Sequence, residues 1–593
     1  MKSDQKNLIL AMLLSALFIT GWQILVVNPR MAAQRAALAA KSLQAKIAKP
    51  ALPAGVVAPG SLTRAAALQL SPRVAIATPK LGGSIALKGA RIDDVVLTTY
   101  HETVSPQSPQ IVLMRPQASK GAYYADFDAV PPQGASEVLP GPDTLWTSSG
   151  GELTPTHPVT LSFDNKAGLV FHRTFSVDDN YMFTISDSVT NNGTSPVSFY
   201  PHAALVRVGT PQVDGYATLF EGLLGKVGDN KLTELTYASI DKEGQGLQDQ
   251  KGTGGWLGFT DKYWATALVP DQSAPIHGVF QSVGKTERTY SAETLGKMVT
   301  LAPGATSTSS TRLFAGAKVT DLIYGYEQKL SIQNFNLMID WGWFWFITQP
   351  MFRLLDILRN FTGSFALAIL LTTVILKGLF FPLANRSFAS MARMKTIQPQ
   401  IKALKERFPD DASAVQRETM EIYKREKINP VAGCLPMLIQ IPVFFSLYKV
   451  LFTTIEMRHA PFFGWIKDMS VPDPTNIFNL FGLLPFDPTQ LPVFGHFLHL
   501  GIWPLVMGLT MFLQMKLNPE PDDPVQRQLF TLMPLIFTFT FGSFPAGLVI
   551  YYAWNNTLTL IQQSFIMKRA GVKVELWSNL TNMFRRRPST GTP

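Results

Sequence analysis

The chain has 593 residues, of which 46% are hydrophobic and only 16% are charged. This composition excludes a single large soluble enzyme and indicates that part of the chain lies in lipid. The formal net charge of +10 would suit nucleic-acid binding, but the Lys and Arg residues gather beside apolar runs and no nucleic-acid-binding motif accompanies them. The single cysteine, Cys434, cannot form an intramolecular disulfide, so any domain outside the cytoplasm depends on its own hydrophobic core.

The first predicted element is an apolar run that follows Lys2 and Lys6. It covers residues 8–27 without a charge, and a helix of that length rises about 30 Å, enough to cross the hydrocarbon layer of a membrane. A cleaved signal peptide also begins with positive charge and remains the alternative. Its apolar core normally has only about 7 to 15 residues, so we expect an uncleaved transmembrane anchor.

A linker and a large β domain are predicted next. Residues 28–71 are rich in Ala, Pro and Lys with weak patterning, so we expect a tether with little structure. Residues 72–340 alternate apolar and polar positions between turn signals such as Asn192-Gly193, which is typical of an antiparallel β-sandwich. Its charged side chains show no catalytic spacing, so we expect them on solvated strand faces and predict no active site. This group comprises Asp126, Asp128, His172, Arg173, Asp178 and Asp179.

The segment that follows, residues 341–360, is dense in Trp and Phe. Aromatic rings with one polar edge favour the headgroup layer, so we expect an amphipathic helix along the outer membrane interface. A transmembrane helix is the competing interpretation, which Pro350, Arg353 and Arg359 disfavour.

Five further apolar runs are typical of transmembrane helices. They are Phe361–Leu383, Ala432–Phe452, Val493–Met515, Leu529–Phe544 and Gly547–Met567. Ten Lys and Arg residues lie between residues 385 and 430, whereas the loop 456–492 carries only Arg458 and Lys467. Because positive charge stays on the cytoplasmic side, we expect both termini in the cytoplasm and the β domain in the periplasm.

The predicted fold class is therefore a polytopic α-helical membrane protein with six transmembrane helices and a large extracytoplasmic antiparallel β-sandwich domain. The expected divisions are a cytoplasmic N-terminus (1–7), an N-terminal anchor (8–27), a linker (28–71), the β-sandwich (72–340), an interfacial helix (341–360), transmembrane helix 2 (361–384), a cytoplasmic helical hairpin (385–430), transmembrane helix 3 (431–455), a periplasmic loop (456–492), transmembrane helix 4 (493–515), a cytoplasmic loop (516–528), transmembrane helices 5 and 6 (529–567) and a basic cytoplasmic tail (568–593).

One charged side chain, Lys377, lies inside the second predicted span, roughly 10 Å from its cytoplasmic edge. A charge at that depth is costly unless it faces water or a partner. Snorkelling of the lysine stem toward the interface is one explanation, and a half-channel open to the cytoplasm is the other. Polar residues in the spans favour the half-channel, although each alone could bond helix to helix. They are Thr372, Thr373, Gln440, Gln514, Asn555, Asn556, Gln562 and Gln563.

Residues 385–430 are predicted to form a basic helical hairpin in the cytoplasm. Ile397, Ile401 and Leu404 recur at helical spacing, and a break around Pro409 precedes a second helix. A merely solvated, charged hairpin is the alternative to a surface that contacts a ribosome or a targeting factor. The residues expected to make such contacts are Arg393, Lys395, Lys402, Lys405, Asp410 and Asp411.

Four segments carry a resemblance to a known family. They are KGLFFPLANRSFASMARMKTIQPQIKALKERF, INPVAGCLPMLIQIPVFFSLYKVL, MPLIFTFTFGSFPAGLVIYYAWNN and LIQQ. These segments resemble the YidC membrane protein insertases, bacterial members of the YidC/Oxa/Alb family, and the order of parts across nearly the whole chain is similar to the Gram-negative type. The likeness of the outer domain rests on its size and strand character.

The resemblance implies a five-helix insertase core that encloses a hydrophilic groove, open to cytoplasm and lipid, with one basic residue on the second span. Lys377 falls at that position, where many relatives have arginine, so the charge is kept but bidentate pairing is lost. Gln440 and Tyr552 match polar groove positions, and Thr373 and Asn555 complete the predicted groove. In the family the third and fifth spans form an apolar slide for the client segment. The corresponding residues here are Ile441, Phe444, Leu447, Leu535 and Phe541.

The function implied by the resemblance is a membrane protein insertase and chaperone of the bacterial inner membrane, acting alone or with the Sec translocon. The expected partners are nascent membrane proteins, the ribosome, the signal recognition particle or its receptor, the Sec translocon and the phospholipid bilayer. No cofactor, metal or catalytic residue is expected, so the chain is not predicted to be an enzyme.

Two rival functions remain as alternatives. A secondary transporter would show inverted repeats and broken helices in corresponding halves, which the sequence lacks. An intramembrane enzyme would need a catalytic set, but His496 and His499 have no third metal ligand, and Gly542-Ser543 lacks the GxSxG context.

Overall fold

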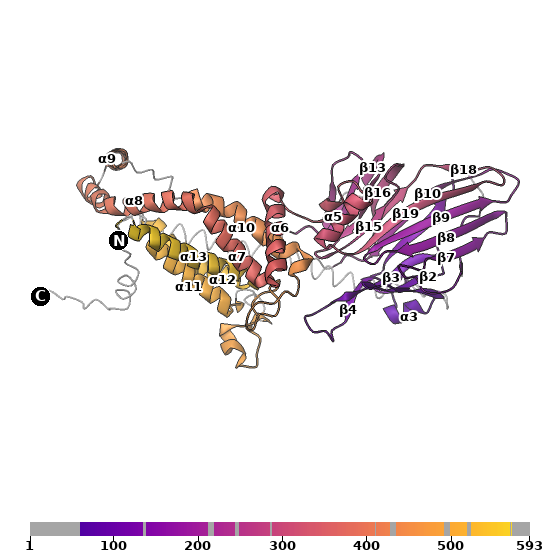
Figure 1. Cartoon of the computed structure of the whole chain (residues 1–593), viewed down its shortest axis with the longest axis horizontal. Coiled ribbons are helices and arrows are strands. Elements are labelled where there is room, and N and C mark those ends of the chain that lie inside the picture. The colour runs from indigo at the N-terminus through magenta and orange to yellow at the C-terminus, as the bar shows by residue number, and fades with distance from the viewer. Residues whose placement is uncertain are drawn as a thin grey trace.

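The structure is a computed structural model. It describes residues 60–133, 138–211, 219–242, 248–284, 287–409, 411–426, 435–490, 498–518, 524–569 and 571. The predicted anchor at 8–27, most of the linker and nearly all of the C-terminal tail lie outside the described residues, as do Asp410, Cys434 and His496. Figure 1 shows an elongated molecule with a β domain at one end and a bundle of helices at the other.

The β domain consists of two antiparallel sheets. The first contains β1 (Arg73–Ala77), β2 (Leu81–Ala86), β3 (Arg91–His101), β4 (Gln110–Met114), β5 (Tyr123–Val130), β10 (Val197–Val208), β13 (Gln248–Thr253), β16 (Pro275–Val283), β17 (Thr289–Leu295) and β18 (Val299–Leu301). The second contains β6 (Thr147–Ser148), β7 (Val159–Asp164), β8 (Leu169–Val177), β9 (Met182–Asn191), β11 (Gly222–Val227), β12 (Thr233–Thr236), β14 (Gly255–Thr260), β15 (Trp264–Val269) and β19 (Thr306–Ala317). The short helices described beside them are α3 (Arg64–Leu68), α4 (Tyr237–Lys242) and α5 (Thr320–Lys329).

The two sheets pack face to face, and the alternating sequence explains how. Along β8 every second side chain is buried, which is the period of a strand with one face in a core. Tyr123 of β5 meets Phe259 of β14 edge to face at 5.6 Å between ring centroids, and the Tyr123 hydroxyl bonds Thr266 of β15. The predicted large antiparallel β-sandwich is confirmed.

Two predictions for this domain are wrong. The linker ends before residue 71, because the Thr63 hydroxyl caps α3 by accepting a hydrogen bond from Ala66 N–H (3.3 Å). Arg173 does not lie on a solvated face. It is buried, and its Nε donates to Asp187 Oδ1 at 2.6 Å on the neighbouring strand.

Asp126 departs from the expectation in the same way, since it forms an ion pair with the buried Arg91. The alternation of a strand indicates which face a residue occupies, but it does not show that a charge on the inner face has a partner across the strands. His172 is the ordinary exposed strand residue that was expected, bonded to Ser162 Oγ at 2.9 Å.

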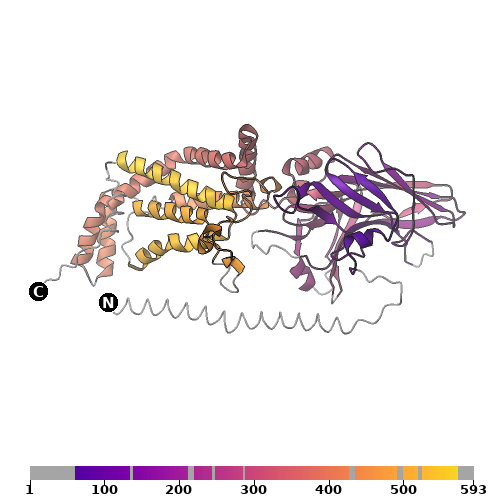
Figure 2. The same ribbon diagram turned by 90° about the horizontal axis from the view of Figure 1, so that it is seen from below.

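The rest of the described chain consists of helices joined by loops. Its elements are η2 (Phe335–Met338), α6 (Trp345–Thr362), α7 (Phe365–Leu379), α8 (Phe381–Arg407), α9 (Ala412–Arg425), α10 (Leu435–Thr453), η4 (Ile455–Met457), η5 (Ile477–Gly482), η6 (Pro488–Gln490), α11 (Ile502–Leu517), α12 (Pro524–Gly542) and α13 (Ala546–Arg569). Helix α11 packs against both α12 and α13, α6 packs against α7 and α10, and α8 packs against α9. Figure 2 shows α8 and α9 extending from the bundle at the end opposite to the β domain.

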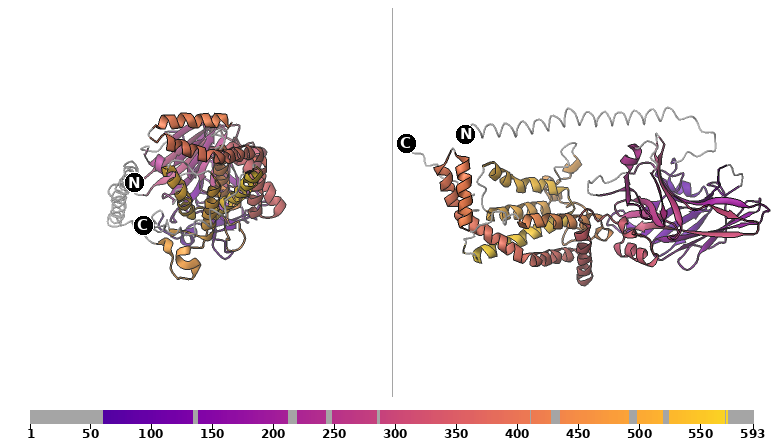
Figure 3. Two further views of the ribbon diagram at one scale, coloured as in Figure 1. Left: turned by 90° about the vertical axis from the view of Figure 1, so that its left-hand side faces the viewer. Right: turned by 90° about the horizontal axis from the view of Figure 1, so that it is seen from above.

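Helix α6 crosses the end of the bundle that faces the β domain (Figures 1 and 3). Its inner face is held by Phe352, which meets the buried Trp341 ring at 5.5 Å, whereas Trp345 and Phe346 are exposed. This placement suits the interfacial helix expected for residues 341–360, shifted by a few residues toward the C-terminus.

Within the described ranges, no helix taken singly combines the length and apolarity needed to cross a membrane. Helices α7 and α8 pass that test only as a pair, bent by 67° at the break between them. The predicted second span, Phe361–Leu383, is interrupted between Leu379 and Phe381, because Pro382 lacks an N–H and disfavours a helical conformation just before it. Its place in the membrane stays a prediction. The count of six transmembrane helices stays a prediction.

Candidate functional site

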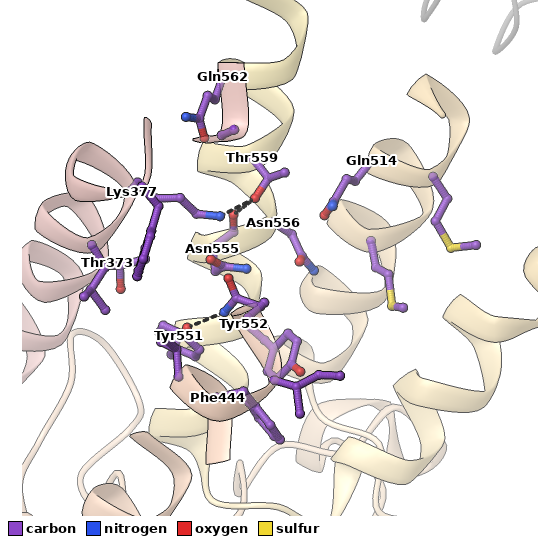
Figure 4. Close-up of a pocket in the computed structure, with 18 of the residues that line it drawn as sticks. Thr373, Lys377, Phe444, Gln514, Tyr551, Tyr552, Asn555, Asn556, Thr559 and Gln562 are labelled. Carbon is purple, nitrogen blue, oxygen red and sulfur yellow. Dashed lines mark hydrogen bonds between the residues drawn. The ribbon is translucent and has the colours of Figure 1, made fainter. Parts of the chain in front are cut away.

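The bundle holds a cavity of about 490 Å³ bordered by α7, α8, α10, α11, α12 and α13. Polar side chains from four of these helices and the residue after α11 line it (Figure 4). They are Thr373, Lys377, Gln440, Gln514, Asn518, Tyr551, Tyr552, Asn555, Asn556, Thr559 and Gln562. All five residues of the predicted groove, Lys377, Gln440, Thr373, Tyr552 and Asn555, are among them.

Lys377 reaches across the cavity from the last turn of α7 to α13. Its half-buried ammonium donates a hydrogen bond of 2.8 Å to Thr559 Oγ1, and that hydroxyl in turn donates to the Asn555 carbonyl at 2.7 Å. Asn555 and Thr559 lie four residues apart, so they share one face of the helix. The ammonium therefore points inward to polar groups, which the snorkelling explanation does not require.

A second hydrogen bond crosses the cavity between α10 and α13. Gln440 Nε2 donates to the Tyr551 hydroxyl at 2.9 Å. The neighbouring Tyr552 ring lies against Phe444 of α10 and Phe541 of α12, with centroids 4.8 and 5.0 Å apart. One side of the cavity is thus polar and the other is aromatic.

The residues of the predicted apolar slide lie in three different settings. Ile441 and Phe444 line the cavity, and Leu535 is exposed on α12. Phe541 is buried against Tyr552. Leu447 is only 1% exposed, so in this conformation it supports the packing of α10 and presents no surface to a client.

Two features of the cavity are not predicted from the sequence. Thr559, the hydrogen-bond partner of Lys377, was not predicted, although its spacing of seven residues from Tyr552 places both on one face of α13. Among the described residues, five methionines also border the cavity, and flexible thioether side chains suit a surface that accepts varied apolar segments. They are Met391, Met507, Met511, Met515 and Met533.

The hairpin residues lie on α8 and at the start of α9. Arg393, Lys402 and Lys405 are exposed, and Lys395 is half-buried. Asp411 caps α9 by accepting a hydrogen bond from Ala414 N–H at 2.9 Å, and Asp410 lies outside the described residues. The exposed basic residues are thus distributed around α8, whereas Asp411 has a structural role as the cap of α9.

Among the described residues, no cluster of His, Cys, Asp and Glu could hold a metal ion. His499 lies before α11, where its Nε2 bonds the Asp473 carbonyl at 3.0 Å. This contact explains His499 as a structural residue of the outer loop.

Comparisons with known proteins cover nearly the whole chain. The family model described as "YidC periplasmic domain" matches residues 73–354, and the one described as "60Kd inner membrane protein" matches residues 357–573. The chain is 55% identical to the membrane protein insertase YidC of Beijerinckia indica subsp. indica, with 100% of each chain covered. It is 54% identical to the membrane protein insertase YidC of Bradyrhizobium diazoefficiens, with 99% of this chain and 100% of the relative covered.

A solved structure described as an active YidC insertase aligns with 82% of this chain and 91% of its own, at 17% identity and a TM-score of 0.34. The full-length likeness to the curated relatives decides the family. This chain, an inner-membrane protein with a large periplasmic domain, belongs to the YidC membrane protein insertase family.

Proposed function

We propose that this chain inserts hydrophobic segments of other proteins into the inner membrane through the cavity around Lys377, acting as a hydrophilic groove open to cytoplasm and lipid. The supporting observation is the convergence of polar side chains from α7, α10, α11 and α13 on one ammonium among helices that are otherwise apolar. Asn556 Nδ2 is also buried without a hydrogen-bond partner among the described residues. Such a group needs water or a polar client group.

The groove lowers the cost of moving a client's hydrophilic flank through the membrane. Water and Lys377 replace part of the hydration that a flank loses, and no covalent step is needed. An acidic group about 4 Å from the ammonium gains roughly 4 kcal/mol at an effective dielectric constant near 20. The membrane potential, about 2.3 kcal/mol per charge per 100 mV, then drives the acidic flank outward.

The apolar part of the client passes along α10 and α12 into lipid. Ile441 lies between cavity and surface, since it lines the cavity and is 44% exposed. Leu535 and Ile536 of α12 are exposed as well. A hydrophobic segment that leaves the aromatic side of the cavity therefore meets apolar side chains before it meets lipid.

The partners follow from this role and from the surfaces of the chain. Nascent membrane proteins and the phospholipid bilayer are the direct ones. The basic residues of α8 suit contacts with the ribosome and with the signal recognition particle or its receptor. We propose that the chain acts alone or with the Sec translocon, with both termini in the cytoplasm.

The test measures insertion of single-span clients with acidic or neutral flanks into vesicles that contain the full-length protein. We expect Lys377→Met to slow the acidic-flanked client at least tenfold and the neutral one much less, because only the acidic flank gains from the ammonium. Lys377→Arg keeps the charge and is expected to retain insertion.

A matched control is Lys516→Met, the same change in the last turn of α11 at a half-buried lysine that does not line the cavity. It is expected to insert both clients normally. If the Lys377→Met variant inserted each client at the same rate as the unaltered protein, the groove would have no part in the mechanism.

A further inference from the structure

The outer loop between α10 and α11 exposes six large apolar side chains within nine residues. They are Phe478, Leu480, Phe481, Leu483, Leu484 and Phe486, with exposed fractions from 39% to 82%. We call residues 477–486 the apolar loop. It contains no charged residue and lies between Asp473 and Asp487. A contiguous exposed patch of this kind marks a surface that another phase or molecule covers.

Backbone groups of the apolar loop pair with one another and with Asn476, the residue just before it. Phe481 N–H donates to the Asn476 carbonyl at 2.7 Å, and Leu484 N–H donates to the Asn479 carbonyl at 3.0 Å. The Asn479 amide also donates to the Phe486 carbonyl at 3.3 Å. Polar backbone groups that satisfy one another can approach an apolar phase at lower cost than groups that need water.

Two bulky residues of the loop adopt a left-handed conformation. Leu480 has φ 52° and ψ 46°, and Phe481 has φ 58° and ψ 32°. This region is unfavourable for large side chains. The loop therefore keeps its apolar residues outside the core of the protein despite backbone strain, which indicates that they are used at the surface.

The base of the apolar loop is fixed to the end of the bundle. The buried Asp473 accepts hydrogen bonds from Thr475 N–H (3.0 Å) and Trp465 Nε1 (3.1 Å) through Oδ1. Its Oδ2 accepts one from Trp503 N–H (2.9 Å) at the start of α11. The direction of the loop is thus set by the helix that follows it.

The apolar loop lies at the same end of the bundle as α6. Figures 1 and 3 show the orange segment around η5 projecting sideways from the end that faces the β domain, as α6 does on another side. Helix α6 exposes Trp345 and Phe346, and tryptophan is enriched in the membrane headgroup layer. Both exposed surfaces therefore lie at the same end of the bundle, on different sides of it.

We propose that the apolar loop inserts into the outer leaflet of the inner membrane and docks the outer end of the bundle on the bilayer. Lipid is the phase that covers the apolar loop, because the loop projects sideways at the same end of the bundle as the aromatic helix α6 and does not point toward the β domain. Docking at two places, through α6 and the loop, fixes the tilt of the bundle in the membrane.

The experiment places a single fluorescent label on the loop of the full-length protein. Cys434 is the sole cysteine, so Cys434→Ser gives a background in which Leu483→Cys carries an environment-sensitive dye. The protein is reconstituted in phosphatidylethanolamine and phosphatidylglycerol vesicles with quencher-labelled lipid. We expect at least a twofold loss of fluorescence, with a second label at Leu484→Cys as an independent site.

The matched control is Met298→Cys. Met298 is 46% exposed and directly precedes β18, a strand that Figure 1 shows in the part of the β domain remote from the bundle. It is expected to show no lipid quenching, whereas Trp345→Cys on α6 is expected to be quenched. Loop labels that behave like Met298→Cys would overturn the proposal. Quenching that appears only when the protein is diluted in the vesicles would also overturn it, because a second copy would then cover the loop at the higher density.

Discussion

The ammonium of Lys449 lies 2.5 Å from Oδ2 of Asp340, and this ion pair joins the bundle to the β domain. Lys449 is buried near the outer end of α10, and Asp340 lies between η2 and α6. The same Asp340 oxygen accepts a hydrogen bond from Phe220 N–H at 3.2 Å, just before β11. One carboxylate therefore fixes a helix of the bundle, the connecting segment and a sheet.

We expect Lys449→Met to destabilise this junction by about 2 kcal/mol, because it leaves the Asp340 charge without its cation. The loss is smaller than for a fully buried pair, since the Asp340 side chain is 23% exposed. The measurement is the thermal unfolding midpoint of the protein in detergent. The double variant Lys449→Met/Asp340→Asn should be more stable than Lys449→Met alone.

The control for this pair is Lys467→Met, which makes the same change at an exposed lysine of the outer loop. It is expected to leave the midpoint unchanged. A double variant that loses the sum of the two single losses would show that Lys449 and Asp340 do not stabilise each other.

The sequence is sufficient for the parts of the structure that depend on local pattern. Alternation predicts the β-sandwich, and helical spacing together with Pro409 predicts the hairpin of α8 and α9. Polarity inside apolar runs predicts Lys377, Gln440 and Asn555 as residues of one cavity. In each case the property that decides the structure is visible in a short stretch of sequence. That property is the burial of one face of an element or the cost of a polar group in lipid.

What the sequence does not indicate depends on contacts between distant segments. Arginine is usually exposed, and the burial of Arg173 depends on its ion pair with Asp187 on the next strand. The burial of Leu447 depends on how α10 packs, and the pairing of Lys449 with Asp340 joins residues 109 positions apart. Thr559 is an ordinary helix residue until the fold brings the Lys377 ammonium to it.

We expect the stability of the β domain to rise between about pH 8 and pH 10 because of Lys318. This side chain is buried and donates a hydrogen bond of 2.9 Å to Thr260 Oγ1, and burial lowers its pKa to about 8. The unfolded chain, with a pKa near 10.4, binds the proton more tightly than the folded one in this window. The free energy of unfolding therefore increases as the pH rises through it.

The variant Lys318→Met tests this pH dependence by thermal unfolding at a series of pH values. It is expected to be more stable than the unaltered protein at pH 7, by on the order of 1 to 3 kcal/mol, with the difference shrinking toward pH 10. A difference that does not change with pH would show that Lys318 has an ordinary pKa in the folded protein.

We expect Thr559→Val to slow the insertion of acidic-flanked clients about fivefold, less than Lys377→Met does. Valine has nearly the same shape but cannot accept the hydrogen bond from the Lys377 ammonium, so the charge loses its fixed position. Thr559→Ser restores the acceptor and is expected to restore the rate. The control is Thr557→Val, which removes only a bond to the Ala553 carbonyl on the same helix.

Helices α11 and α12 approach so closely at Gly508 that a methyl group there has no room. A Cβ at this position would lie 1.9 Å from Thr538 Oγ1, which is held in place because it donates to the Pro534 carbonyl at 2.7 Å. We therefore expect Gly508→Ala to lower the thermal unfolding midpoint in detergent strongly, by an overpacking cost of about 1 to 3 kcal/mol. Adding Thr538→Ala should recover most of the loss, because the next nearest atom, Thr538 Cβ, is 3.2 Å away. Gly378→Ala, on a helical glycine with open space around it, is the control and should have little effect. If Thr538→Ala deepened the loss instead, the contact between these two helices would not be what requires a glycine.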